Sequence, residues 1–496
     1  MRKSTIIMIL FMLAAVTLHA QNETDALRYG QLFRTGGTAR SLSMGNAFGA
    51  LGGDMGALSI NPAGIGVFRR GAFSFSPSYL FDKTSADYLG ETRSEFENKL
   101  SIGNVGFVST YNTGRDKGWV SMSFGATYNK ETNYSKQIQI AARNNNGSYL
   151  NYFANMADGW NITDLYAYEE ALAYNVYLID TVNGDPYDYE TILSEYGDMA
   201  NSTYGEMQRR TISRSGYSSE YLFTFGANFS YNFYLGGSLS IQSLRYKRTF
   251  THNETDDQGT IYEFDYFRFN DNLETVGTGM GLKLGFIYKP VKILRIGGAV
   301  HFPVVYRLRD NYYTTIEAGY DFADSQGNTV YNDQSPDGNY TYRLSTPLHA
   351  ILSGALVFGK LGLVSLDYEY VDYSNLRLRN GEDGYDFADK NDAIQSAYTS
   401  VHNLRAGAEI RLGTLSVRGG AMYSSSPYRS SELNKDAFTM SYSAGLGFKD
   451  RNLSLDLGYV FTAHKENYVL YPNPQGNYAA LSSARHNVIA TIAFRF

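Results

Sequence analysis

The sequence predicts an all-β protein: a transmembrane antiparallel β-barrel of about 14 strands with an N-terminal hatch, or plug, inside its lumen. Three features of the 496 residues predict it. Long segments alternate between apolar and polar residues, and the connections between them are short at one end and long at the other. A segment of small residues without such alternation precedes them. These features divide the chain into residues 1–20, 21–70 and 71–496.

Residues 1–20 have the pattern of a secretory signal peptide. Arg2 and Lys3 precede an apolar run from Ile6 to Val16, and Ala20 offers a small residue for cleavage before Gln21. A membrane anchor is less favoured, because a helical span needs about 20 apolar residues. The pattern indicates export from the cytoplasm.

The composition excludes several function classes. After cleavage, 41 Lys and Arg face 49 Asp and Glu, a net charge of −8 that argues against a nucleic-acid partner. The chain has no cysteine, so disulfides and thiolate metal sites are excluded. No G-x-S-x-G, H-E-x-x-H or phosphate-loop pattern occurs, and the histidines lack metal-ligand spacing. We therefore expect neither an enzyme nor a metal or other cofactor.

Residues 21–70 predict a compact plug. They are rich in glycine and alanine, and a barrel lumen narrower than a porin's must be filled or it becomes a pore. Glycine permits close backbone approach and unusual torsions. Pro62 biases Asn61 away from helix, and an asparagine side chain can bond the backbone in a turn. One specified turn is therefore expected at Asn61.

Residues 71–496 carry the strand signal. In residues 294–308 one face is almost wholly apolar, and the other carries the charges. Residues 404–412 and 488–496 alternate in the same way. The segments exceed the usual 5–6 residues of globular strands, which favours a membrane barrel over a soluble sandwich. In a membrane barrel the apolar face meets lipid and the charged face lines the lumen.

The connections give the strand count. Tight turns are expected at Asn112–Lys117, Phe233–Leu235, Pro290–Lys292, Lys360–Leu361, Gly413–Thr414 and Lys449–Asn452. Long loops are expected at 83–100, 131–218, 251–273, 310–346, 379–398, 426–436 and 466–484. Six hairpins, a first strand near Gly71–Phe81 and a last near Arg485–Phe496 make 14 strands, with both ends on the short-turn, periplasmic side.

The loop at 131–218 is long and acidic. Residues Asn161 to Leu178 have apolar residues at helical spacing, and Thr163 and Asp164 suit a helix start. Two interpretations are equally favoured: an extracellular lid with an apolar face for hydrophobic ligands, or a helix packed on its own loop.

Residues 36–68, GGTARSLSMGNAFGALGGDMGALSINPAGIGVF, resemble the N-terminal hatch of the OmpP1/FadL/TodX family of outer-membrane transport proteins. The matching elements include Met44-Gly45, Asp54 and above all Asn61-Pro62-Ala63-Gly64. Residues 281–304, 346–375, 402–428 and 443–461 also resemble that family. The tyrosine-rich strands resemble those of members from Bacteroidetes.

The resemblance implies a 14-stranded barrel in the bacterial outer membrane. It implies passive uptake of hydrophobic small molecules, such as long-chain fatty acids, through extracellular capture and hatch movement. Partners would be that ligand and outer-membrane lipid, and the barrel would be a monomer. The hatch residues it marks are Gly45, Asp54, Asn61, Pro62, Ala63 and Gly64.

His301, Arg307 and Arg309 are candidate ligand-binding residues. Their alternation places them on the lumen face of one strand, where arginine could hold a fatty-acid carboxylate with paired donors. The structural alternative is pairing with lumen carboxylates, for which Asp367, Glu369, Glu409 and Asp456 are candidates.

Two other functions stay open at this stage. A haem-binding receptor would use His301 as an iron ligand. An adhesin or secretion-associated barrel would bind protein partners through its loops.

Overall fold

The computed structural model describes residues 22–31, 35–145, 147–193, 206–381, 383–472 and 476–496. The expected signal peptide, residues 1–20, lies outside the described residues. None of the described helices is long and apolar enough to cross a membrane.

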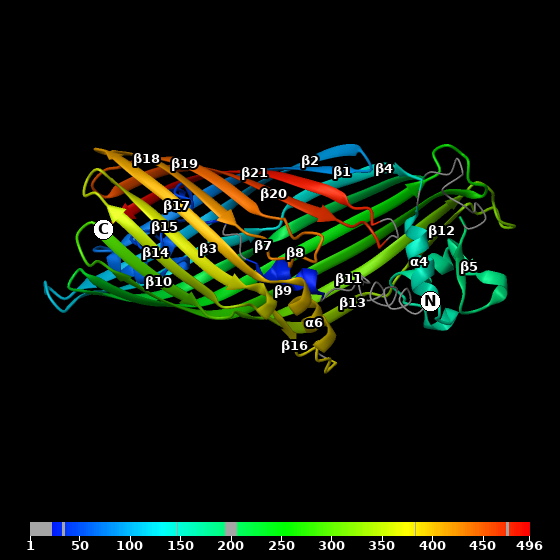
Figure 1. Cartoon of the computed structure of the whole chain (residues 1–496), viewed down its shortest axis with the longest axis horizontal. Coiled ribbons are helices and arrows are strands. Elements are labelled where there is room, and N and C mark those ends of the chain that lie inside the picture. Colours follow the sequence, from blue (N-terminus) through cyan, green and yellow to red (C-terminus); the bar gives the residue numbers. More distant parts are fainter. Residues whose placement is uncertain (1–21, 32–34, 146, 194–205, 382, 473–475) are drawn as a thin grey trace.

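Fourteen antiparallel strands form one closed barrel (Figure 1), as the sequence predicts. Ten are continuous: β1 (Ala72–Tyr88), β2 (Glu91–Asn112), β7 (Glu206–Phe229), β8 (Phe233–Thr255), β9 (Phe264–Tyr288), β17 (Ser400–Leu412), β18 (Leu415–Ser424), β19 (Thr439–Lys449), β20 (Leu453–Tyr468) and β21 (Ala479–Arg495). Four are interrupted: β3 (Trp119–Asn133) with β4 (Lys136–Asn144); β10 (Leu294–His301) with β11 (Val305–Tyr320); β12 (Val330–Gln334) with β13 (Gly338–Ser345) and β14 (His349–Val357); and β15 (Gly362–Asp372) with β16 (Arg377–Arg379).

Pairing of β1 with β21 closes the sheet. Phe73 lies opposite Phe494, and the register continues to Asp87 opposite Ala480. The amide of Phe496 donates to the carbonyl of Gly71 over 3.0 Å, so both ends of the barrel sequence meet at the end with the short turns. Pairing of the first strand with the last removes the two free edges that an open sheet would expose to hydrocarbon.

The two faces of the barrel have opposite chemistry. Large apolar side chains such as Met280, Leu284 and Leu352 are exposed on the outer face. Polar and charged side chains such as Asp367, Glu369 and Glu409 are buried on the inner face. This inversion of the pattern of a soluble protein is what a bilayer outside and a filled lumen inside demand.

The strands extend further than the sequence predicts. The predicted loop 83–100 is wrong: β1 and β2 continue through it and join at Leu89 and Gly90. Most of the other predicted loops shrink in the same way, since β8 runs to Thr255 and β9 starts at Phe264. Residues 91–101 are exposed or half-buried and none is buried, so the apolar alternation that marks a strand is lost there. The tight turn predicted at Phe233–Leu235 lies at 230–232 instead, where Ser230 and Tyr231 have positive φ.

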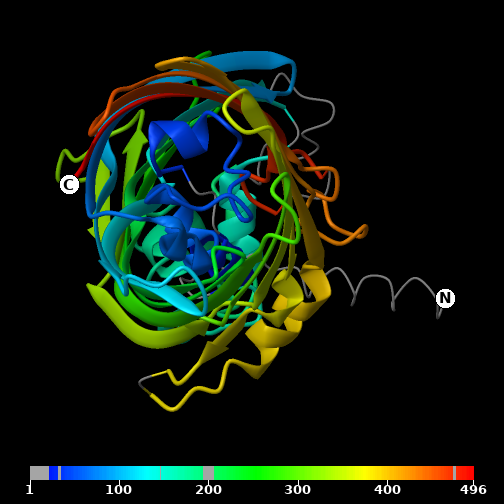
Figure 2. The same cartoon turned by 90° about the vertical axis from the view of Figure 1, so that its left-hand side faces the viewer.

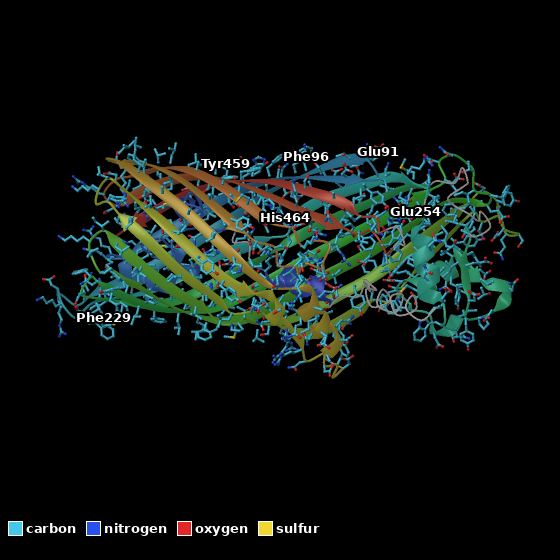
Figure 3. The ribbon with its side chains drawn as sticks, viewed as in Figure 1. Glu91, Phe96, Phe229, Glu254, Tyr459 and His464 are labelled. Carbon is cyan, nitrogen blue, oxygen red and sulfur yellow. The ribbon has the colours of Figure 1, made fainter. Side chains whose placement is uncertain are left out.

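A cap of residues 147–193 covers the end opposite the short turns. It contains α4 (Tyr149–Ala157), η4 (Ile162–Asp164), α5 (Glu170–Asn175), β5 (Ile179–Thr181), η5 (Val182–Gly184) and β6 (Tyr189–Thr191). Figure 1 shows α4 and β5 at this end, and in Figure 3 Glu254 lies beside the cap while Phe229 lies at the short-turn end.

The single helix predicted over Asn161–Leu178 is wrong. The side chain of Asn161 caps η4, Leu165 is non-helical, and α5 starts only at Glu170. The apolar residues Leu165, Leu172 and Val176 are buried in one cluster with Phe250 and Phe269 of the barrel wall. The apolar face is thus used to seat the cap on the barrel.

Candidate functional site: the plug and its seat

The N-terminal residues 22–31 and 35–70 run through the lumen, and Figure 2 shows them as the blue segment enclosed by the ring of strands. We call residues 35–68 the plug. It contains α3 (Ala39–Leu42), η2 (Gly56–Ser59) and η3 (Pro62–Val67), and it follows α2 (Glu23–Gly30). Almost every plug residue is buried.

Asn61 is the centre of the plug's hydrogen bonds. Its side chain accepts from the amide of Ala63 over 3.0 Å, which caps η3, while Pro62 occupies the first turn. Its amide nitrogen donates to the carbonyl of Gly49 over 2.6 Å and to the carbonyl of Phe286 over 3.0 Å. One side chain therefore joins two plug segments to strand β9.

Gly64 and Ala63 fill the space behind this turn. The amide of Gly53 donates to the carbonyl of Gly64 over 3.0 Å. Gly52 has a φ of 63°, and a Cβ on Gly64 would lie 3.1 Å from the Gly52 Cα, tighter than ordinary van der Waals contact. Ala63 packs against Tyr234 and Ile287. The turn therefore requires small residues on both of its sides.

Asp54 connects the other two plug helices. The Thr38 hydroxyl donates to both carboxylate oxygens, over 2.7 and 2.9 Å, and the amide of Gly56 donates to one over 3.0 Å. Thr38 also forms a capping box with Ser41 at the start of α3. Burial raises the pKa of Asp54 above its ordinary value, and the charge of Arg40 and the Thr38 bond oppose that rise.

Glycines on the barrel wall form the seat of the plug. A Cβ on any of ten wall glycines would lie within 3.0 Å of a plug atom. These glycines lie on ten different strands: Gly106, Gly125, Gly226, Gly236, Gly285, Gly297, Gly407, Gly420, Gly445 and Gly458. Several face one another across strands, as Gly226 faces Gly236 and Gly236 faces Gly285. We call this ring the glycine seat; it lets main-chain and side-chain atoms of the plug lie directly on the wall.

Gly45 of the plug lies in close contact with the wall at the glycine seat. It has a φ of 61°, and its amide donates to the hydroxyl of Ser443 over 3.1 Å. A Cβ there would meet the carbonyl oxygen of Ala421. Both the torsion and the close approach favour glycine at this position.

Charged wall residues hold the plug at fixed points. Arg40 donates to Glu409 over 2.9 and 3.2 Å. Burial alone would lower the pKa of the Arg40 guanidinium, but the Glu409 carboxylate raises it above the ordinary value. Arg418 bridges Glu409 and Asp456 over 2.8 and 2.6 Å.

Other wall groups bond the plug main chain. Asp367 accepts from the amide of Gly49 over 2.9 Å. Arg295 donates to the carbonyl of Leu51 over 2.7 Å, and Lys283 donates to that of Ser59 over 2.9 Å. These contacts fix the segment that leads into the Asn61 turn.

His301 lies where the sequence places it, inside the barrel. Its ring Nε2 lies 2.9 Å from the carbonyl oxygen of Ile60, directly before Asn61. It contacts the His349 ring, with centroids 6.0 Å apart. Its visible role is therefore to hold the plug.

The predicted lumen positions of Arg307 and Arg309 are wrong. Both are exposed, while their neighbours Tyr306 and Leu308 are buried. The strand is interrupted between His301 and Val305, and this break shifts the alternation by one residue. Residues with odd numbers face inward before the break and outward after it.

One pocket adjoins the plug, and a second lies at the strand break. The first lies between plug residues Leu42 and Asn46 and hydroxyl-bearing side chains such as Ser441 and Thr462 of strands β19 and β20. The second is lined by Gly30 of α2 and by wall residues that include Lys283, His301 and Phe302. Above the plug, Leu27 and Tyr29 of α2 pack among wall tyrosines such as Tyr246 and Tyr342.

Sequence reasoning missed the glycine seat and the plug-to-wall ion pair Arg40–Glu409. The seat glycines are visible in the sequence as glycines on predicted strands. Their shared level around the barrel becomes visible only once the register is known.

No family model matches the sequence, and no curated protein sequence matches it either. Several solved structures match nearly the whole chain, and two of them are described here. The crystal structure of a Pseudomonas aeruginosa FadL homologue is 13% identical, covers 93% of this chain and 98% of its own, and has a TM-score of 0.54. That of the P. putida toluene transporter TodX is 13% identical, covers 93% and 99%, and has a TM-score of 0.51. The chain therefore has the fold of these two proteins.

Proposed function

We propose that this protein is a bacterial outer-membrane channel of the FadL/TodX type for the passive uptake of hydrophobic small molecules. The observation that carries the proposal is a plug seated inside a closed 14-strand barrel, a fold shared with a FadL homologue and with the toluene transporter TodX. The proposed division is a signal peptide at 1–20, a hatch at 21–70 and a barrel at 71–496.

The plug closes the direct path, so the proposed uptake needs a local shift of the plug. The Asn61 turn is the proposed control point, because one side chain holds Gly49, Ala63 and Phe286 together. Pro62, Gly64, Asp54 and Gly45 shape the same segment. An apolar ligand would pass the packed aromatic cluster around α2, where Leu27 and Tyr29 contact wall tyrosines.

Long-chain fatty acids are the proposed substrates, and aromatic hydrocarbons are the alternative among hydrophobic small molecules. A haem receptor has no observation in its favour, because His301 bonds the carbonyl of Ile60. The buried polar residues Ser148, His252 and Glu254 at the cap do not indicate an enzyme either. There the Ser148 hydroxyl donates to Glu254 and not to the histidine base that a nucleophile needs.

The first test identifies what the barrel carries. The protein is refolded in a detergent that does not resemble a fatty acid, incubated with a bacterial lipid extract and examined by native mass spectrometry. A retained fatty acid or hydrocarbon supports the proposal, and retained haem contradicts it.

The second test concerns the hatch. Asn61→Ala or Pro62→Gly is expected to lower fatty-acid uptake into proteoliposomes while the barrel stays folded. Loss of the Asn61 side chain leaves two carbonyls without their donor, at a cost of about 1–3 kcal/mol. Asn328→Ala is the matched control, since Asn328 bonds only within an exposed loop at Asp324. Unchanged uptake in both hatch variants would remove the hatch role.

A further inference from the structure

We propose that the outer wall of the barrel carries a binding site for a phosphorylated membrane lipid, built by Arg307, Arg309 and Arg343. The inference goes beyond the proposed transport function and requires only that the barrel spans a membrane. The three arginines lie on strands β11 and β13, and these two strands run side by side in Figure 1.

The arginines form a row across the strands. Arg307 of β11 lies directly opposite Arg343 of β13, and Arg343 lies directly opposite Arg379 of β16. Arg309 lies two residues further along β11 on the same face. All four side chains are exposed, whereas the residues between them, such as Leu308 and Leu344, are buried.

This row is unfavourable without a partner. Like charges directly opposite one another destabilise a strand pair. Within the described part of the chain, Arg307, Arg309 and Arg343 have no ion pair or hydrogen bond through their guanidinium groups. On the adjacent strand β9, the carboxylate of Glu274 is already held by Arg245 at 2.8 Å and Lys247 at 3.5 Å. The charge of the row must therefore be balanced from outside the chain.

The level of the row on the wall identifies the partner. Val305 faces Met280 across β11 and β9, and both are exposed, at 50% and 58%. Below them on β9 follow Leu282, Leu284, Phe286 and Tyr288, all exposed toward lipid. One outward position above Val305 is Arg307, opposite Thr278. The arginines therefore start where the apolar belt ends, about 7 Å further along the strand.

This boundary lies on the side away from the short turns, where lipid headgroups meet the barrel. Arginine offers paired donors that match phosphate oxygens, and several arginines can share one phosphorylated headgroup. The acyl chains of the same lipid would lie on the apolar belt beneath. Charge and apolar surface in this order fit a phosphate-bearing glycolipid of the outer leaflet.

The test compares the wild-type protein with Arg307→Gln/Arg309→Gln/Arg343→Gln in detergent. The probes are diphosphorylated lipid A, the same lipid without phosphates, inorganic phosphate and a polyglutamate peptide, and binding is followed by native mass spectrometry and by the shift in thermal midpoint. The matched control, Arg70→Gln/Arg115→Gln/Lys117→Gln, removes the same charge from exposed residues at the short-turn end.

We expect the wild type and the control to bind phosphorylated lipid A, and the triple arginine variant to bind it at least about tenfold more weakly. Dephosphorylated lipid should bind poorly to all three. In lipid-free detergent the triple variant should be as stable as the wild type or more stable, because repulsion is removed. This shows that it is folded.

Three outcomes would overturn the proposal. Equal binding of lipid A by the wild type and the triple variant removes the arginines from the site. Inorganic phosphate at millimolar concentration that abolishes lipid binding indicates a free-anion site. Arginine-dependent binding of polyglutamate without binding of lipid A indicates an acidic protein partner.

Discussion

At the scale of single residues, the plug and the wall are complementary: plug atoms fill the space that side chains would take at the wall glycines. The carbonyl of Pro62 lies at Gly236, the side chain of Asn61 lies at Gly285, and the carbonyl of Gly49 lies at Gly297. Hydrogen bonds then hold the plug atoms that enter this space, since Asn61 donates to the carbonyl of Phe286, beside Gly285. One methyl group added at a seat glycine would therefore disturb the contact between the plug and the wall.

Gly285→Ala and Gly297→Ala are expected to unseat the plug while the barrel still forms. Alanine is acceptable in a strand, but the new Cβ would lie within 3.0 Å of Asn61 or Gly49. Ion conductance in planar bilayers should rise. Gly354→Ala is the matched control, because a Cβ there meets nothing within 4 Å. Low conductance in both seat variants would show that the plug shifts without opening a path.

The plug turn could be predicted because its chemistry is local. Asn61 caps the helix that begins at Pro62, two positions that adjoin in sequence. The wall partners could not be predicted, since Arg40 and Glu409 are far apart in the chain and meet only through barrel closure. That Glu409 lines the lumen could be predicted from its strand alternation.

At the scale of elements, interruptions decide which face a residue occupies. Alternation predicts the inward position of His301 correctly because β10 is regular up to that residue. It fails for Arg307 and Arg309 because Phe302–Val304 break the strand and contain a proline. Pro303 marks the break in the sequence, because proline cannot donate to a strand ladder and is confined to edges, strand starts and bulges. The shift of the alternation by one residue is visible only in the structure.

The cap is an element whose packing should depend on pH. Glu169 is 3% exposed and accepts from the Tyr152 hydroxyl over 2.9 Å. Burial raises the pKa of Glu169 to about 8, and the charges of Glu170 and Asp271 add to the rise while the Tyr152 bond opposes it. The folded cap therefore holds a proton that the unfolded cap releases near its ordinary pKa of 4.5.

The free energy that holds the cap in place should fall as pH rises from about 4.5 to about 8 and then level off. Hydrogen exchange in residues 149–193, corrected for the intrinsic pH effect, measures this as faster opening at pH 8.5 than at pH 5. Glu169→Gln should remove most of the dependence. Glu190→Gln, at an exposed carboxylate of β6, should leave it intact. An unaltered dependence in Glu169→Gln would assign it to other groups.

At the scale of the whole molecule, the plug takes no part in the pairing of the first strand with the last, although it bonds the wall at one seam. The amides of Gly36 and Gly37 donate to the carbonyls of Lys130 and Gly103 over 2.8 and 3.2 Å, where β2 and β3 no longer pair. The pairing of β1 with β21 completes the sheet without any plug residue. The buried wall charges also keep wall partners: Arg418 bonds both Glu409 and Asp456, and Arg405 pairs with Glu369. Removal of Arg40 therefore leaves Glu409 still paired. These wall charges therefore keep ion-pair partners without the plug, although the plug and the barrel are continuous in sequence.

Deletion of residues 22–68 is thus expected to give a folded barrel with a wide polar pore. It should keep the mobility shift of a folded barrel on unheated gels and show a large rise in single-channel conductance. Replacement of cap residues 149–193 by a short Gly-Ser linker should leave conductance low, because the glycine seat still holds the plug. If the cap deletion opened the channel and the plug deletion did not, the seal would lie at the cap. The Asn61 turn would then not be the control point of uptake.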